Sequence, residues 1–195
     1  PRLRCQVDAV DTQDSRLVTD GYAFRLVSGT ALPFADAAFD VILSNHVIEH
    51  VGQRESQKHH LDELKRVLRP EGIVYLAVPN RWMLVEPHYG LAFLSWWPTS
   101  WRTPWLRLWK KGEYYDCEPL AVRELEGLLQ ESGFRFRNVS VEATRLFYEI
   151  EKPDALLTRG LRRMPDAVLA ALRPVIPTLC YVLEKRHCSS PPRHS

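Results

Sequence analysis

The fold is decided by the stretch Phe39-Asp40-Val41-Ile42-Leu43-Ser44, which is almost continuously apolar. Such a run is typical of a parallel-sheet strand that is buried on both faces. Residues 53–68 then place leucines and a valine at helical spacing, and this helix is predicted to end at Arg69-Pro70-Glu71-Gly72 because Pro and Gly terminate helices. Residues 73–78 predict the next strand. Together they make a βαβ unit, which is right-handed when its strands lie parallel in one sheet.

The same alternation continues on both sides of this unit. Upstream, residues 6–11 and 24–27 are predicted to be short strands. Downstream, a helix from Pro119 to Gly133 is followed by strands at 134–141 and 178–183. The apolar phase slips within 134–141, which predicts either a bulge near Asn138 or burial on both faces. The pattern as a whole predicts an α/β fold with a mostly parallel sheet.

Three segments depart from this alternation. Residues 81–118 hold all six tryptophans and show no clean period, so we expect an insertion that acts as a lid or a substrate-binding segment. Residues 154–176 carry an amphipathic helical pattern that is interrupted at Pro165 and Pro174. Residues 187–195 lack core-forming side chains, and we expect a flexible tail there.

Composition limits the classes of partner. The chain has 195 residues, 45% hydrophobic and 26% charged, which is typical of about one globular domain. Its formal net charge of +2 is too small to make nucleic acid an expected partner. The four cysteines are scattered without a CxxC pair, which favours neither a zinc knuckle nor a disulfide framework and predicts a cytoplasmic location.

In a doubly wound sheet, ligands bind outside the carboxyl ends of the strands. Four places in the sequence meet this condition, namely Asp11 and residues 29–34, 44–46 and 79–80. A carboxylate after a strand can accept two hydrogen bonds from a ribose diol, which is why nucleotide-type cofactors select an acid there. The alternative for Asp11 is a solvated turn residue or a helix cap.

Three ordered motifs carry a family resemblance: residues 28–44 with Leu-Pro-Phe and Phe-Asp, residues 47–51 with Glu-His, and residues 61–72 ending in Leu-Arg-Pro-Glu-Gly. This series resembles the class I S-adenosylmethionine-dependent methyltransferases, in particular the small-molecule subgroup called methyltransferase type 11. The resemblance implies a Rossmann-like fold, with a mostly parallel sheet and an antiparallel last strand, and S-adenosylmethionine as the cofactor.

The resemblance also assigns cofactor-binding residues at three places. Asp11 matches the acid that holds the cofactor ribose. The loop beside adenine matches Thr30, Ala31 and Leu32, although Thr30 stands where the family commonly has Asp. The turn that lines the methionine moiety and faces the acceptor matches Ser44, Asn45 and His46.

One family feature is not found in the sequence. By analogy with dinucleotide folds, the first strand and its Gly-rich turn should precede Asp11 by roughly 20 residues. The family sheet places that strand between the strand ending at Asp11 and the strand ending at Ser44. We therefore expect residues 1–186 to be a partial, N-terminally truncated methyltransferase domain, a fragment that binds the cofactor poorly.

Methyl transfer demands mainly positioning, because the nucleophile must stand about 3 Å from the sulfonium methyl and in line with the leaving sulfur. A neutral hydroxyl acceptor also needs a base, for which His88, Glu86 and His46 are the candidates, with His50 beside them. Structural hydrogen bonding is the alternative for each. Adjacent helical residues diverge, so His59 and His60 are not a metal pair, and no metal site is predicted.

The tryptophan-rich insertion bears on the acceptor. Amphipathic rings interleaved with cations suit an apolar substrate under a lid, a sugar, or a bilayer interface, and the alternative is a small satellite core. We therefore expect methyl transfer to a small-molecule or lipid-like acceptor, with possible peripheral membrane contact through residues 81–118. A cofactor-free membrane-peripheral or protein-binding module on the same fold is the second hypothesis, and a nicotinamide-dependent oxidoreductase is a weaker third.

Overall fold

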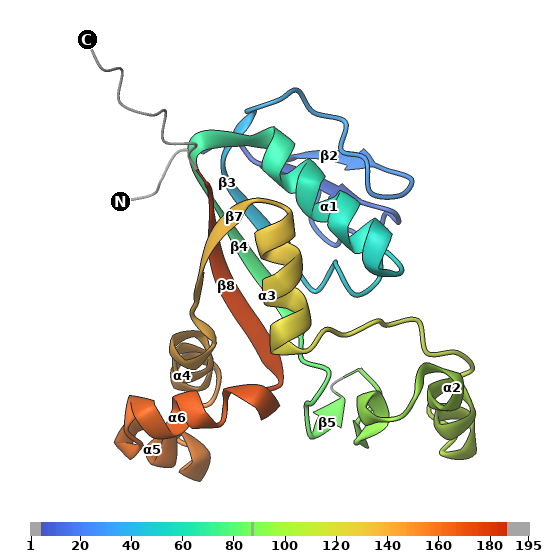
Figure 1. Ribbon diagram of the computed structural model, residues 1–195, viewed down its shortest axis with the longest axis vertical. Helices are drawn as coiled ribbons and strands as arrows, with labels where there is room; N and C mark the ends of the chain where they lie inside the picture. The colour runs from blue at the N-terminus through green and yellow to red at the C-terminus, as the bar shows by residue number, and fades with distance from the viewer. Residues whose placement is uncertain (1–4, 87, 187–195) are drawn as a thin grey trace.

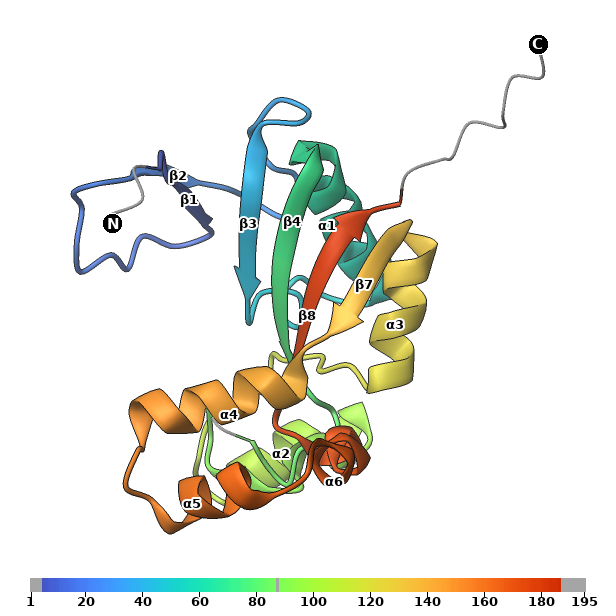
Figure 2. The same cartoon turned by 90° about the vertical axis from the view of Figure 1, so that its left-hand side faces the viewer.

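A computed structural model describes residues 5–86 and 88–186. Its main sheet has the strand order β3-β4-β8-β7, formed by β3 (Phe39–Asn45), β4 (Leu68–Pro79), β8 (Thr178–Lys185) and β7 (Phe134–Asn138). Strands β3 and β4 are parallel, and β8 runs antiparallel to both of its neighbours (Figure 2). The predicted α/β fold with an antiparallel last strand is thereby confirmed. The expected tail at 187–195 lies outside the described residues.

Two helices cover one face of this sheet and make the main core. They are α1 (Arg54–Val67) and α3 (Val122–Glu131), which both views place on the same side (Figures 1 and 2). The helical spacing noted in the sequence puts Leu61 of α1 and Leu125 and Leu128 of α3 into the core, where all three are fully buried. Each such leucine contributes roughly 1.5–3 kcal/mol of transfer free energy.

Strand β4 begins earlier than predicted. Helix α1 ends at Val67, but the Pro70 segment belongs to the strand instead of a loop. The register shifts from Phe39↔Leu68 to Val41↔Ile73, and this irregularity accommodates a proline that cannot donate to the ladder. Gly72 is required there because a Cβ at this position would lie 2.7 Å from Leu68 Cδ1 and 2.9 Å from the Asp40 carbonyl.

Strands β1 (Asp8–Asp11) and β2 (Ala23–Leu26) form a parallel pair of their own. Within the described chain they share no ladder with β3, whose edge they face in Figure 2. Strand β3 was expected to be buried on both faces, and this expectation is wrong: Val41 is 57% exposed and Leu43 is 74% exposed. The reason is that α1 and α3 cover only the opposite face of the main sheet.

The segment expected to be one strand over 134–141 is a strand followed by a helix. Strand β7 ends at Asn138, and α4 (Ser140–Glu151) begins two residues later. The Asn138 side-chain oxygen accepts the Ser140 N–H at 3.1 Å, a local turn that competes with the ladder. The slip in apolar phase therefore marks the end of the strand.

The helical pattern at 154–176 is found, with a break at Pro165, whereas Pro174 lies within a 3-10 helix. It forms α5 (Leu156–Arg163), α6 (Asp166–Ala171) and the short 3-10 helix η2 (Arg173–Val175). These pack with α4 around a second small core. Figure 2 places α4, α5 and α6 beyond the end of the sheet at which β3 and β4 terminate.

The tryptophan-rich insertion lies at the same end. It consists of β5 (Val85–Glu86), β6 (Leu91–Ala92), the 3-10 helix η1 (Leu94–Trp96) and α2 (Thr99–Leu108). Its core is built from Leu91, Leu94, Leu106, Tyr115 and Cys117, with Trp105 against it. The described helices include none with the length and apolarity that a membrane span requires.

Candidate active site

The carboxyl ends of β3 and β4 meet at a sharply turned loop. His46 follows β3 with φ of 54°, a left-handed conformation that costs a non-glycine residue about 1–3 kcal/mol. Its backbone N–H donates to the Ala77 carbonyl of β4 at 2.9 Å, which holds the turn against the neighbouring strand. The loop after β3 is therefore fixed in a conformation that directs residues 46–50 toward the insertion.

Glu49 is the most unusual residue of this loop. It is 0% exposed, yet neither carboxylate oxygen accepts a hydrogen bond within the described chain. His46 Nδ1 lies 3.2 Å from Glu49 Oε1 without forming a hydrogen bond of good geometry, and His50 Nε2 lies 3.9 Å away. A buried carboxylate without donors is costly, so its environment calls for a donor or a positive charge.

The insertion contributes a histidine–carboxylate pair to the same place. His88 Nδ1 lies 2.7 Å from Glu86 Oε1, and the other Glu86 oxygen accepts the Tyr89 N–H at 2.8 Å. Glu86 is buried, whereas the His88 side chain is partly exposed. A buried carboxylate that holds one ring nitrogen leaves the other nitrogen free to exchange a proton, which is the arrangement of a general base.

The three predicted catalytic residues lie together. The His88 ring centroid is 6.2 Å from that of His46 and 6.2 Å from that of His50. Asp116 and Cys117, which sequence reasoning missed, join them from the end of the insertion. Burial, reinforced by the carboxylates of Asp116, Glu86 and Glu49, raises the pKa of the Cys117 thiol above its ordinary value.

The predicted adenine-side loop is fastened to α1. Leu32 donates its N–H to Glu63 at 2.8 Å, and Arg66 donates to the carbonyls of Leu32 and Phe34 and to Asp36. The side-chain hydrogen bond from Arg66 holds the pKa of Glu63 at about 2. This clamp gives the Leu-Pro-Phe segment its fixed position, but it occupies the Leu32 N–H.

The remaining predicted cofactor residues fall into two groups. Asp11, at the end of β1, is exposed and accepts the Gln13 N–H at 3.2 Å, as in a turn. Thr30 Oγ1 is 2.6 Å from His59 Nδ1, and Ala31 is exposed. Within the described residues, no hydrogen bond joins this group to Asn45 at the end of β3.

Ser44 points away from the strand end, into the layer between β3 and α1. Its hydroxyl lies 3.2 Å from His60 Nε2, and both side chains are buried. Burial lowers the pKa of His60 to about 4, so this histidine is neutral at pH 7. Ser44 therefore acts on the site through packing, whereas Asn45 and His46 lie at the open end of the strand.

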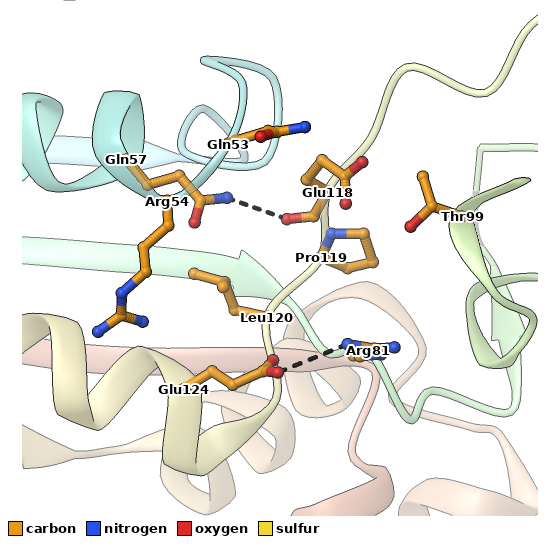
Figure 3. A pocket seen from close by; sticks show the side chains of 9 residues that line it. All are labelled: Gln53, Arg54, Gln57, Arg81, Thr99, Glu118, Pro119, Leu120 and Glu124. Atoms are coloured by element: carbon orange, nitrogen blue, oxygen red, sulfur yellow. Dashed lines mark hydrogen bonds and ion pairs between the residues drawn. The ribbon is translucent and has the colours of Figure 1, made fainter.

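A separate pocket of about 360 Å³ borders this region (Figure 3). It lies between the first turn of α1, Arg81 and residues 118–120, and most of its lining residues are of polar or charged type. The Glu118 N–H donates to the Glu49 carbonyl at 2.8 Å. This backbone hydrogen bond connects the pocket to the loop formed by residues 46–50 after β3. None of the predicted site residues lines it.

Comparisons with known proteins show similarity to methyltransferases. A family model described as a methyltransferase domain matches residues 4–76. A solved S-adenosylmethionine dependent methyltransferase from Mesorhizobium loti superposes with a TM-score of 0.57, at 13% identity over 92% of this chain and 80% of that one, which shows a shared fold. Residues 4–76 are thus similar to the methyltransferase domain family, and the chain shares the fold of an S-adenosylmethionine dependent methyltransferase.

Curated relatives are similar to this chain over part of their length. An uncharacterized methyltransferase from Mycolicibacterium vanbaalenii is 50% identical over 54 residues, 28% of this chain and 20% of the relative. A ubiquinone biosynthesis O-methyltransferase from Parvibaculum lavamentivorans is 28% identical over 120 residues, 62% of this chain and 43% of the relative. The chain thus spans from a fifth to under half of these two proteins. The family's cofactor is S-adenosylmethionine.

Proposed function

We propose that this protein transfers the methyl group of S-adenosylmethionine to a hydroxyl oxygen of a small, lipid-like acceptor. The His88–Glu86 pair carries the proposal. It lies beside the turn after β3, where the family places the cofactor's methionine end, and it supplies the base that a neutral hydroxyl requires.

The cofactor would be held from two sides. Asp11 offers an exposed carboxylate for the ribose diol, and Thr30, Ala31 and Leu32 would flank the adenine. Asn45 and His46 would meet the methionine end, where the buried Nδ1 of His46 lacks a hydrogen bond. These side chains have the hydrogen-bonding chemistry that S-adenosylmethionine requires, because a carboxylate can accept from the ribose hydroxyls while amide and imidazole groups can bind the polar methionine end.

The proposed chemistry uses one proton transfer by the protein. When bound, S-adenosylmethionine supplies an electrophilic methyl group on a sulfonium centre. His88 Nε2 would take the proton of the acceptor hydroxyl as its oxygen bonds to the methyl carbon, while the carbon–sulfur electron pair leaves with sulfur. Buried Glu86 orients the ring through Nδ1 and stabilises the imidazolium that forms.

The exposed face of the insertion supports a lipid-like acceptor. Trp97 and Trp101 are stacked at 6.2 Å with an interplanar angle of 15°, and Trp101 is 61% exposed. Trp109 is also exposed, and Lys110 and Lys111 follow it. Indole rings next to lysines favour a membrane interface, where the ring lies among head groups and the cation meets anionic lipid. The similarity to the ubiquinone biosynthesis O-methyltransferase from Parvibaculum lavamentivorans supports this acceptor chemistry.

A second function is favoured by one observation. The Leu32 N–H and the Thr30 hydroxyl already have partners within the protein. A cofactor-free membrane-peripheral or protein-binding module would retain such internal bonds and still use the exposed tryptophans. For either function we propose action in the cytoplasm, in keeping with the unpaired thiols of Cys5, Cys117 and Cys180.

Calorimetry with S-adenosylhomocysteine on the natural gene product separates the two functions. For a methyltransferase we expect S-adenosylhomocysteine to bind with a micromolar Kd. The Kd should rise more than about tenfold in Asp11→Ala, because a charge-assisted pair of hydrogen bonds is lost. The matched control is Asp20→Ala, an exposed turn aspartate outside the candidate site. Absent binding, together with association with anionic vesicles, would support the module and refute the methyltransferase.

A further inference from the structure

Three metal-ligating side chains from two distant segments converge next to the histidine–carboxylate pair. His50 comes from the loop after β3, whereas Asp116 and Cys117 end the insertion. One ligand atom from each lies within 4.8 Å of the other two. Cys117 is buried, and His50 and Asp116 are reachable from solvent, so an ion could enter without unfolding the core.

The separations suit a tetrahedral ion. His50 Nδ1 and Nε2 both lie 3.8 Å from Cys117 Sγ, and Nδ1 lies 3.7 Å from Asp116 Oδ2. Cys117 Sγ lies 3.6 Å from Asp116 Oδ1. Ligands at the zinc distances of about 2.0–2.3 Å in tetrahedral geometry stand about 3.3–3.8 Å apart. Small side-chain rotations would bring all three atoms onto one ion.

A buried carboxylate provides the second, independent observation. Glu49 Oε1 lies 3.9 Å from His50 Nε2 and 3.2 Å from His46 Nδ1, whereas His50 Nδ1 lies 3.7 Å from Asp116 Oδ2. Glu49 is completely buried and has no donor in the described structure. A ligating histidine characteristically donates its second ring N–H to a carboxylate, so Glu49 stands where such an orienting partner is needed.

The surrounding charge also favours a cation. Glu49 and Glu86 are buried near the cluster, and Asp116 belongs to it. Arg102, a buried cation of the insertion, is directed to Glu118 at 3.5 Å and to the Trp97 carbonyl at 3.0 Å. Several carboxylates with little local compensation repel one another at low dielectric constant, and a bound ion would relieve that repulsion.

We propose that His50, Asp116 and Cys117 bind one divalent transition-metal ion of the zinc class, with Glu49 orienting the His50 ring. Mixed nitrogen, sulfur and oxygen donors select zinc-like ions over magnesium and calcium, which prefer oxygen ligands. Three protein ligands leave the fourth position open, as in metal sites that bind water or substrate.

This site differs from the prediction that no metal is bound, which rested on His59 and His60. Those two side chains do diverge, since His59 contacts Thr30 and His60 contacts Ser44. The proposed site arises from residues 66 positions apart in the chain, counting from His50 to Asp116, so no local spacing could indicate it.

Metal binding to the purified, chelator-treated protein tests the proposal. Isothermal titration with Zn²⁺ should give one site per chain, and Co²⁺ should give tetrahedral absorption bands with a thiolate-to-cobalt charge-transfer band. We expect His50→Ala and Asp116→Asn to weaken affinity by more than about 100-fold, since even outer-shell partners contribute about 10- to 100-fold. Cys117→Ser should remove the charge-transfer band.

Matched controls make the result specific. His59→Ala and Cys5→Ser change a histidine and a cysteine outside the cluster and should leave the Zn²⁺ affinity unchanged. Because Cys117 belongs to the insertion core, its variant is checked by circular dichroism, while Asp116→Asn at an exposed position tests the ligand set independently. No Zn²⁺ binding, or equal loss in the controls, would overturn the proposal.

The readout is independent of the proposed methyltransferase activity. Metal binding is measured without S-adenosylmethionine, and S-adenosylhomocysteine binding is measured after metal removal. A protein that binds Zn²⁺ but no S-adenosylhomocysteine would refute the proposed function and retain the metal site. The reverse result would refute the metal site alone.

Discussion

His88 Nδ1 lies 2.7 Å from Oε1 of Glu86, a carboxylate that is 1% exposed. The two residues sit on either side of Pro87 in the insertion, so the pair is local in sequence, but its neighbours His46 and His50 come from the loop after β3. The insertion therefore completes a cluster that β3 begins.

The pair predicts a defined loss of turnover. In the natural gene product, His88→Ala should lower kcat by about 10²–10⁴-fold, the usual contribution of a general base, while S-adenosylhomocysteine affinity stays the same. Glu86→Gln should lower kcat less, because a neutral partner still orients the ring. Glu149→Gln, at an exposed position of α4, is the control for the second change. Unchanged kcat in His88→Ala would remove the base from the mechanism.

The loop clamp predicts a stability difference between two arginines. Arg66 donates to two carbonyls of residues 32–34 and to two carboxylates. Its replacement by alanine should lower the free energy of unfolding, because several charge-assisted hydrogen bonds are lost. Exposed Arg123→Ala on α3 should stay within about 0.5 kcal/mol. Urea denaturation measures both, and equal effects would contradict the clamp.

Stability should fall on acidification in two steps. His60 has a folded pKa of about 4 against an ordinary value of 6.5, so the unfolded chain binds a proton that the folded protein refuses between these values. Stability is therefore lost as pH falls from 6.5 to 4, by about 3 kcal/mol. Glu63, with a folded pKa of about 2, adds a loss between pH 4.5 and 2. Denaturation of His60→Gln across pH 4–7 should lack the first step; a slope equal to that of the native chain would show that His60 is not its source.

Two glycines should respond to alanine with opposite signs. At Gly72 a Cβ would meet Leu68 and the Asp40 carbonyl below 3.0 Å, so Gly72→Ala should destabilise the fold by about 1–3 kcal/mol. At Gly127 in α3 nothing lies within 4 Å of the added atom, so Gly127→Ala should stabilise by about 0.5–1 kcal/mol. Thermal unfolding of both variants measures these changes in stability. If Gly72→Ala had the same stability as the native protein, β3 and β4 would approach each other less closely than described.

Strand β3 shows which structural features the sequence can predict and which it cannot. The apolar run from Phe39 to Ser44 and the leucine spacing of α1 are local signals, and they predicted the βαβ unit correctly. Exposure of Leu43 depends on what packs against the other face of the sheet, which no local period records. Helix α4 was missed because its first turn continues the apolar residues of β7.

The candidate site divides in the same way. His46, Glu86 and His88 were predicted because each follows a strand end or stands in a short polar motif near one. The sequence shows that Glu49 belongs to the loop after β3. It does not show that the carboxylate is buried without hydrogen-bond donors, because this depends on how other segments pack around it. Cys117 and Asp116 carry no motif, and they join the site only because the insertion returns to the main sheet after residue 109.

The exposed tryptophans of the insertion should contribute to membrane binding. Trp101→Ser should reduce binding to vesicles containing anionic lipid, because a large amphipathic ring is lost from the surface, and should leave the thermal midpoint unchanged. Trp82→Ser is the control, because Trp82 is less exposed than Trp101 and packs edge-on against Trp96 at 5.4 Å. Equal vesicle binding by the native protein and Trp101→Ser, measured by sedimentation, would argue against a lipid-like acceptor.

The central claim is that the transferable methyl group is presented to the His88–Glu86 pair. Its most direct test is NMR of the natural gene product with S-adenosylmethionine labelled with ¹³C at the methyl carbon. The account predicts nuclear Overhauser contacts from that methyl to the imidazole protons of His88 or His46, lost in Asp11→Ala. Binding of the labelled cofactor without contacts to either ring, or no binding at all, would contradict it.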